Sequence, residues 1–193
     1  MLWMLIGLTG FIASHLVRVV AEHWRTKMVQ LLGAKNYKRI YSLITLVSLV
    51  LIIWGYGTAR HESPLLWTMP LHVYPLTAVL MLLSMICLAG FHIAQSHLSV
   101  KLRHPMLWSV VLLCSAHLIV NGRLIDALLF GSLLVWSVVD LISCYKRDRQ
   151  KLVQYPQAQT LATVWNLLMG FVFYGVFAFF LHRPLIGVSP ILG

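Results

Sequence analysis

The chain has 193 residues, of which 60% are hydrophobic and only 10% are charged, and its mean hydropathy is +0.83. Soluble domains carry about 25% charged residues, so this composition excludes a water-soluble globular protein. It predicts that the lipid bilayer itself surrounds the chain. The formal net charge of +10 comes from basic residues that cluster in short segments between apolar runs, which is the usual bias of membrane proteins, so we also exclude a nucleic-acid partner.

Apolar runs long enough to cross a bilayer follow one another along the chain. A membrane-spanning helix needs about 20 mostly apolar residues. Six segments fit: Leu2–Ala21, Ile40–Gly57, Leu76–Ala94, Pro105–Val120, Leu124–Ser143 and Thr160–Leu181. The first run has no basic segment before it and no obvious cleavage site, so we interpret it as a span rather than a signal peptide. Because the connections are short, the sequence predicts an all-α membrane helix bundle that forms one domain over residues 1–193.

The distribution of Lys and Arg between the connections predicts the orientation of the bundle. Eleven lie in the first, third and fifth connections: Arg25, Lys27, Lys35, Lys38, Arg39, Lys101, Arg103, Lys146, Arg147, Arg149 and Lys151. Only Arg60, Arg123 and Arg183 lie on the other side. The second connection contains three prolines, Trp67 and Tyr74, and is predicted to be an ordered cap with solvated histidines. Cytoplasmic loops carry the excess of Lys and Arg, so both termini are predicted to lie outside.

Three of the nine histidines fall within predicted spans, where an ionisable side chain is costly and usually faces the bundle interior. His117 lies about 20 Å along a helix from His104, and therefore beyond the middle of the membrane core. His15 lies about 11 Å from the cytoplasmic end of the first span, and His92 lies nearer to that end. His104 precedes Pro105 at a helix start, where we expect its ring to reach water.

Each intramembrane histidine has two interpretations. The structural one is a hydrogen bond from the ring to a backbone carbonyl of a neighbouring helix, and we prefer it for His92, which is followed by Gln95. Two deep histidines in one small bundle favour a bound group instead, because imidazole is the commonest metal ligand and a frequent axial ligand of haem iron. His15 and His117 are therefore candidate metal ligands.

Arg18 follows His15 by one turn, on the same face of the predicted helix. Its guanidinium can hold a carboxylate such as a haem propionate, or it can extend to the membrane interface or pair with Asp140, and both interpretations stay open. The three cysteines form no CxxC pair. The sequence also contains no intramembrane carboxylate dyad, Gly-rich phosphate loop, HExxH motif or nucleophile elbow, which disfavours the corresponding enzyme classes.

Five segments, in their order along the chain, resemble the NnrU family of bacterial membrane proteins, which also includes the plant zeta-carotene isomerases. They are SHLVR in the first span, NYKRIYSLITLVSLVLIIWGYG, RHPML, AHLIVNG and LLFGSLLVW. The resemblance covers essentially the whole chain and rests on the order and spacing of these segments together. It implies a bacterial inner-membrane protein with a role in nitric oxide and nitrite metabolism during denitrification.

The resemblance also implies a cofactor. In the isomerase branch, two histidines hold a haem b, and they match His15 and His117 of this chain. A cysteine of the isomerase matches Cys114, which lies one turn before His117. The resemblance therefore implies that Cys114 is an alternative ligand or a neighbour of the iron. Bacterial members often place an acidic residue directly after Asn-Gly, where this chain has Arg123 and, a turn later, Asp126. The expected cofactor is thus haem b, with a nitrogen-oxide or apolar small molecule as its partner.

Three functions stay open at this point. The protein is a haem-binding redox or sensor protein, or an isomerase-like enzyme that acts on an apolar membrane substrate, although haem ligands alone do not imply isomerase activity. It is alternatively a small transporter or channel with a histidine-lined path, but its clearest helix break, at Pro105, lies at a span start rather than at mid-membrane. It is otherwise an assembly subunit of a respiratory enzyme, with no chemistry of its own.

Overall fold

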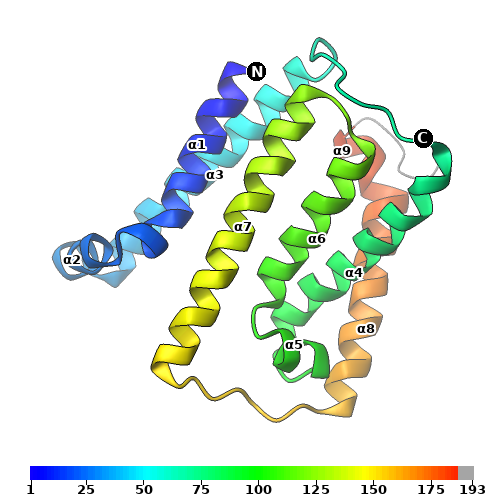
Figure 1. Cartoon of the computed structure of the whole chain (residues 1–193). Coiled ribbons are helices and arrows are strands. Elements are labelled where there is room, and N and C mark those ends of the chain that lie inside the picture. Colours follow the sequence, from blue (N-terminus) through cyan, green and yellow to red (C-terminus); the bar gives the residue numbers. More distant parts are fainter. Residues whose placement is uncertain (187–193) are drawn as a thin grey trace. The chain divides into compact units, whose positions relative to one another are not determined.

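A computed structural model describes residues 1–186, and they are almost entirely helical (Figure 1). The helices are α1 (Leu2–Val20), α2 (Glu22–Leu32), α3 (Ala34–Ala59), η1 (Leu71–Val73), α4 (Tyr74–His92), α5 (His97–Leu102), α6 (Pro105–Val120), α7 (Leu124–Lys151), α8 (Thr160–Gly175), the π-helical turn η2 (Val176–Leu181) and α9 (His182–Ile186). Strand pairing within this range is limited to an isolated bridge between Leu65 and Arg123. The predicted all-α class is confirmed.

The chain divides into two compact units. The first combines Met1–Leu66 with Arg123–Ser132, and so contains α1, α2, α3 and the start of α7. The second combines Trp67–Gly122 with the chain from Leu133 onward. Since α7 contributes residues to both units, each part of it is described with the unit to which it belongs, and the single domain over residues 1–193 stays a prediction.

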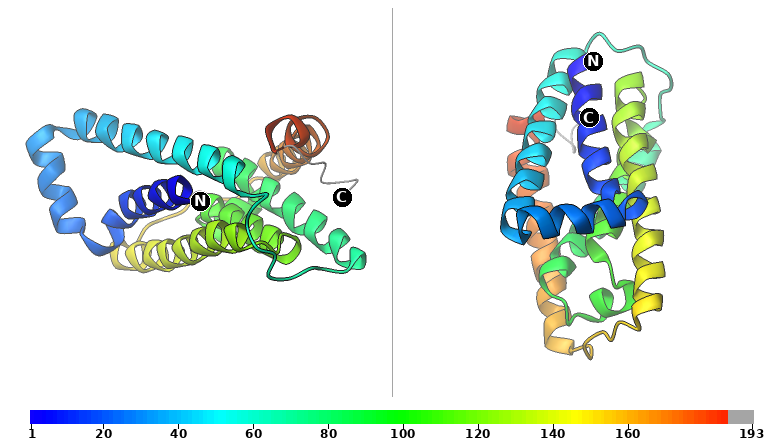
Figure 2. Two further views of the ribbon diagram at one scale, coloured as in Figure 1. Left: turned by 90° about the horizontal axis from the view of Figure 1, so that it is seen from above. Right: turned by 90° about the vertical axis from the view of Figure 1, so that its left-hand side faces the viewer.

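In the first unit, α1 and α3 pack side by side through small residues (Figures 1 and 2). Gly7 of α1 lies against α3 so closely that a Cβ atom there would be 2.6 Å from the Ser48 carbonyl oxygen. Gly55 of α3 lies in the same way against the backbone of Met4, which is fully buried. Helices in lipid associate through such close approaches, because no hydrophobic force draws them together there. These contacts hold the helix that carries His15.

In the second unit, α4 packs against both α6 and α8. Ser84 of α4 donates a 2.8 Å hydrogen bond to the carbonyl of Ser109 in α6. Ser99 of α5 donates one of the same length to the carbonyl of Gly90 in α4. These serines are buried, and each is satisfied across a helix contact, which is required where water cannot supply a partner. These hydrogen bonds fix the positions of α5 and α6 against α4. His117 lies on α6.

The predicted cap is ordered through backbone pairing. In the first unit, the Leu124 amide donates to the Pro64 carbonyl at 2.9 Å, next to the bridge between Leu65 and Arg123. In the second unit, the Trp67 amide donates to the Gly122 carbonyl at 3.2 Å. The histidines of this connection, His61 and His72, are exposed, as the sequence predicted.

Five stretches are long and apolar enough to cross a membrane: α1, α3, α4, α7 and the continuous stretch Thr160–Pro184. Large apolar side chains remain exposed along them, including Ile53 at 63% and Leu161 at 68% of their surface. A surface of this kind requires lipid rather than water around it. The chain is a multi-pass membrane protein in which α6, with 16 residues or about 24 Å of helix, is short against a core of about 30 Å.

Two helices extend beyond the predicted spans. α3 begins at Ala34 rather than Ile40, and α7 continues to Lys151 rather than ending at Ser143. Both extensions are rich in Lys and Arg. A helix satisfies its own backbone in water as well as in lipid, so it continues where the apolar stretch ends, whereas hydropathy detects only the part that suits lipid.

Reporter fusions at four positions will determine whether α6 crosses the membrane. With six spans, fusions at Lys35, Lys101 and Arg149 report the cytoplasm, and a fusion after Gly193, which lies outside the described residues, reports the opposite side. If α6 does not cross, the side changes after Lys101, so that Arg149 reports the outside and Gly193 the cytoplasm. The Lys35 fusion is the control, because α6 does not affect its position.

Candidate cofactor-binding residues

His15 lies on α1 in the first unit, half-buried and held on three sides. Its Nδ1 atom is 2.7 Å from the carbonyl oxygen of Phe11, one turn earlier in the helix. Its ring stacks on the Phe11 ring, with centroids 4.1 Å apart, and meets the edge of the Tyr41 ring of α3 at 5.5 Å. The ring therefore has a defined orientation toward α3, set by aromatic neighbours on both helices.

His117 lies on α6 in the second unit and makes the same local contact as His15. Its Nδ1 atom is 2.9 Å from the carbonyl oxygen of Leu113, again one turn earlier. It is half-buried, and its own carbonyl accepts the bond from Asn121 that ends α6. His117 thus stands in the last turn of its helix, directly before the Asn-Gly turn.

The shared contact determines which ring nitrogen can bind a metal. A carbonyl oxygen can only accept, so Nδ1 must carry the proton in both rings. In the neutral ring, the lone pair is then on Nε2, the nitrogen with which a histidine in this arrangement binds a metal. The fold sets the same tautomer in both candidate ligands, by the same helical geometry.

The two neighbours predicted for the cofactor differ in their surroundings. Cys114 is fully buried on α6, one turn before His117. Arg18 is exposed on the last turn of α1, one turn beyond His15. Asp140, the other partner considered for Arg18, lies 3.6 Å from Arg147 within α7. The acid is thus engaged locally, while Arg18 presents its charge at the end of α1.

The expectation that His104 is solvated is wrong. Its Nε2–H donates to Asp148 Oδ2 of α7 at 2.6 Å, and only 21% of its side chain is exposed. The hydroxyl of Tyr155 donates to the same carboxylate oxygen, and burial together with this bond raises the pKa of Tyr155 to about 12. His104 is therefore a structural link between the start of α6, the end of α7 and the segment that follows it.

His92 differs from the two candidate ligands in its surroundings, and the hydrogen bond expected from its ring to a neighbouring helix stays a prediction. His92 ends α4, is exposed, and meets the ring of Phe91 edge-on at 5.1 Å. It is therefore a suitable comparison for the two candidate ligands.

A buried carboxylate in the first unit was not foreseen as part of a cluster. Asp126 is only 4% exposed, and its Oδ1 accepts a 2.7 Å hydrogen bond from the hydroxyl of Tyr56. Its Oδ2 accepts from the Arg123 amide at 3.2 Å, as in a capping box at the start of α7. The Arg123 side chain donates to the Ser63 carbonyl at 2.7 Å. The residue directly after Asn-Gly thus anchors the cap, and the acid a turn later caps the helix.

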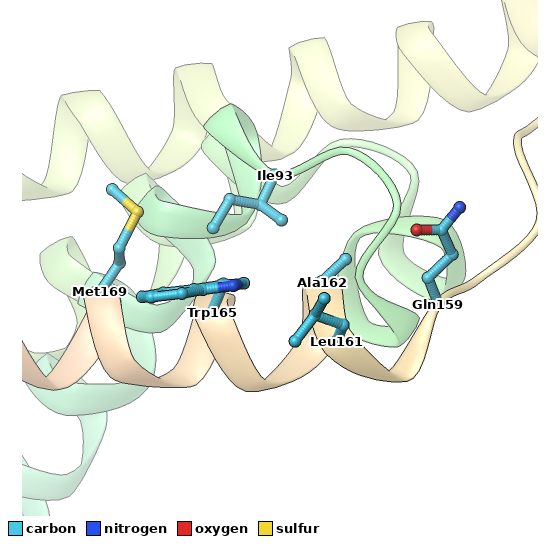
Figure 3. A pocket seen from close by; sticks show the side chains of 6 residues that line it. All are labelled: Ile93, Gln159, Leu161, Ala162, Trp165 and Met169. Atoms are coloured by element: carbon cyan, nitrogen blue, oxygen red, sulfur yellow. The ribbon is translucent and has the colours of Figure 1, made fainter.

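An open pocket in the second unit lies at the start of α8 (Figure 3). Its lining is mostly apolar: Ile93, Gln159, Leu161, Ala162, Trp165 and Met169. The figure shows the Trp165 ring lying along the helix opposite Ile93, with Gln159 at the far end. None of the lining residues was predicted for the haem site, so this pocket is not the candidate haem site.

Residues 1–186 contain no cluster of three or more His, Cys, Asp or Glu side chains that could hold a metal ion.

Comparison with protein-family models finds a match that covers the chain. A family model described as NnrU protein matches residues 3–190, which is nearly the whole chain. No curated protein and no solved structure matches this chain.

Proposed function

Because the chain belongs to the NnrU family, we propose that it is a haem b-binding protein of the bacterial inner membrane, with His15 and His117 as axial ligands. The family match supports the broader assignment. The pairing of the two histidines is our inference from their depth in the predicted spans and from the resemblance to the isomerase branch.

The observation that carries this proposal is the common hydrogen bond of the two rings. In both, Nδ1 is within 3 Å of a carbonyl oxygen one turn earlier, at 2.7 Å for His15 and 2.9 Å for His117. A bond of this kind orients a ligating histidine and makes it a stronger base. Two residues on different helices share it, and both lie within apolar helices. Two such donors would suit a low-spin haem.

Other residues of this chain have roles that follow from their positions. Arg18, with its charge at the end of α1, would pair with a haem propionate. Cys114, buried one turn before His117, would be an alternative ligand or a neighbour of the metal. Haem when bound would supply one-electron chemistry, which agrees with the proposed link to nitric oxide and nitrite metabolism.

An absorption spectrum of the detergent-purified full chain tests the function directly. We expect a Soret band and, after reduction, sharp α and β bands, with a haem content close to one per chain. A correctly folded but colourless preparation from haem-replete cells would contradict the proposal and favour a transporter or an assembly subunit. Nitric oxide added to the reduced protein should shift the Soret band, whereas an isomerase-like enzyme is distinguished by turnover of an apolar substrate.

A further inference from the structure

The segment between α1 and α3 is a helix that contacts both of these neighbours and yet stays largely exposed. In the first unit, α2 lies across the end of the α1–α3 pair instead of continuing either helix (Figure 2). None of its residues is buried. Trp24, Leu31 and Leu32 are 52%, 75% and 41% exposed, which is costly for large apolar side chains in water.

The sequence of α2 has the pattern of a helix that lies at a membrane surface. Its apolar stripe is Trp24, Met28, Leu31 and Leu32, with the spacing i, i+4, i+7 and i+8 of one helical face. Arg25 and Lys27 border this stripe on opposite sides. Glu22, Thr26 and Gln30 occupy the opposite face. Cations at the edges of an apolar stripe can place their stems in the acyl region and their charges among the lipid phosphates.

The position of α2 along the chain brings it to the membrane surface. α1 contains 19 residues and is about as long as the membrane core is thick, and α2 begins one residue after it ends. Only Gly33 separates α2 from α3, and its φ of +76° belongs to a region that favours glycine. Two one-residue turns, at Ala21 and Gly33, therefore hold α2 crosswise between the end of α1 and the charged extension of α3, which is the interfacial region beside the core.

The charge around α2 identifies the surface it fits. Residues 18 to 39 contain six Lys and Arg, which are Arg18, Arg25, Lys27, Lys35, Lys38 and Arg39, and a single acid, Glu22. The acid is paired with Arg25 at 3.0 Å, and the guanidinium also lies over the Tyr37 ring. Because an exposed pair of this kind is weak, Arg25 can exchange Glu22 for a lipid phosphate. Arg18, Lys35, Lys38 and Arg39 are exposed. Such a concentration of positive charge beside an apolar stripe is complementary to anionic phospholipid headgroups.

We propose that α2 is an interfacial helix that binds the anionic phospholipids of one leaflet, with its apolar stripe among the acyl chains and Arg25 and Lys27 on the phosphates. The binding site is distinct from the histidines of the proposed haem site.

Amide hydrogen exchange of α2, measured on the full chain in lipid nanodiscs, tests this proposal. We expect the α2 amides to exchange more slowly in discs that contain phosphatidylglycerol than in discs of phosphatidylcholine alone. In the R25Q/K27Q double variant the dependence on phosphatidylglycerol should weaken by about fivefold for each cation removed. The charge-matched control is K146Q/R149Q, two exposed cations at the end of α7, which should leave the α2 response unchanged.

Three results would overturn the proposal. The first is the same exchange rate in neutral and anionic discs, and the second is an equal loss of the response in the K146Q/R149Q control, which would indicate net charge alone. The third is slow exchange of the α2 amides in lipid-free detergent, at the same rate in the Leu31→Gln variant as in the original chain. That result would indicate that a protein contact, rather than lipid, protects the helix. Glycerol phosphate added to neutral discs should not reproduce the protection, and if it does, the site binds free phosphate rather than a lipid surface. Circular dichroism confirms that each variant remains helical.

Discussion

Alanine at His15 or at His117 should lower the haem content of the purified protein by about tenfold or more, or convert a six-coordinate spectrum into a five-coordinate one. Loss of groups that only orient a metal ligand already costs about 10–100-fold in affinity, so loss of a ligand itself should cost at least as much. The measurements are haem content per chain and the reduced spectrum in the same detergent. Each variant removes one imidazole and leaves the other in its own unit.

His92→Ala is the matched control for these two variants. His92 is also a histidine of an apolar helix, but it is exposed at the end of α4. His104 is unsuitable, because its removal leaves Asp148 without one of its two donors and should destabilise the protein whether or not haem is bound. If His92→Ala removes the haem and His15→Ala does not, the proposed pair is wrong and α4 supplies the ligand.

A glycine variant separates loss of the ligand from loss of the fold. In His117→Gly, added imidazole should enter the space left by the ring and restore the six-coordinate spectrum, if His117 is a ligand. A variant that has lost its haem because α6 no longer packs on α4 would not respond to imidazole. Failure of rescue at both His15 and His117, with unchanged helicity, would count against axial ligation by either residue.

The fold class was predictable because the membrane permits few backbone structures. Every backbone polar group in lipid must be satisfied within the segment, so long apolar runs become helices. Pro105 and the Asn121-Gly122 turn even marked both ends of α6. The first connection was interpreted as a loop, although the stripe that begins at Trp24 was present in the sequence. Its charges lower its hydropathy, so a search for apolar runs does not detect the period of the stripe.

The sequence could predict which residues belong to the candidate site, but not which residues they contact. An imidazole in an apolar run is visible in a sequence, and so is the carbonyl four residues before it. The partners of His104 and Asp126 were not visible, because Asp148 lies 44 residues from His104 and Tyr56 lies 70 residues from Asp126. Such pairs depend on which helix faces which, and hydropathy does not contain that information. Gly55 and Gly57 illustrate the same limit, since the sequence does not show which of them contacts another helix.

Gly55→Ala should destabilise the protein, whereas Gly57→Ala should not. A Cβ atom at Gly55 would lie 2.9 Å from the Met4 Cα and Trp3 carbonyl carbon and closer still to the Met4 nitrogen, and all of these are backbone atoms of α1. Backbone cannot turn aside as a side chain can, so α1 must move away from α3, at a cost of about 1–3 kcal/mol or more. At Gly57 nothing lies within 4 Å, and alanine there should stabilise the helix by about 0.5–1 kcal/mol.

Thermal unfolding in a mild detergent, followed by circular dichroism, measures the difference between these two variants. The pair is closely matched, because both substitutions add one methyl group to the last turns of α3. Since α1 carries His15, a displaced α1 should also reduce haem retention in Gly55→Ala and not in Gly57→Ala. Equal stability of the two variants would mean that α1 and α3 do not approach each other closely at Met4. A stable Gly55→Ala protein without haem would instead mean that α1 moves without unfolding, and that its position matters chiefly for the ligand it carries.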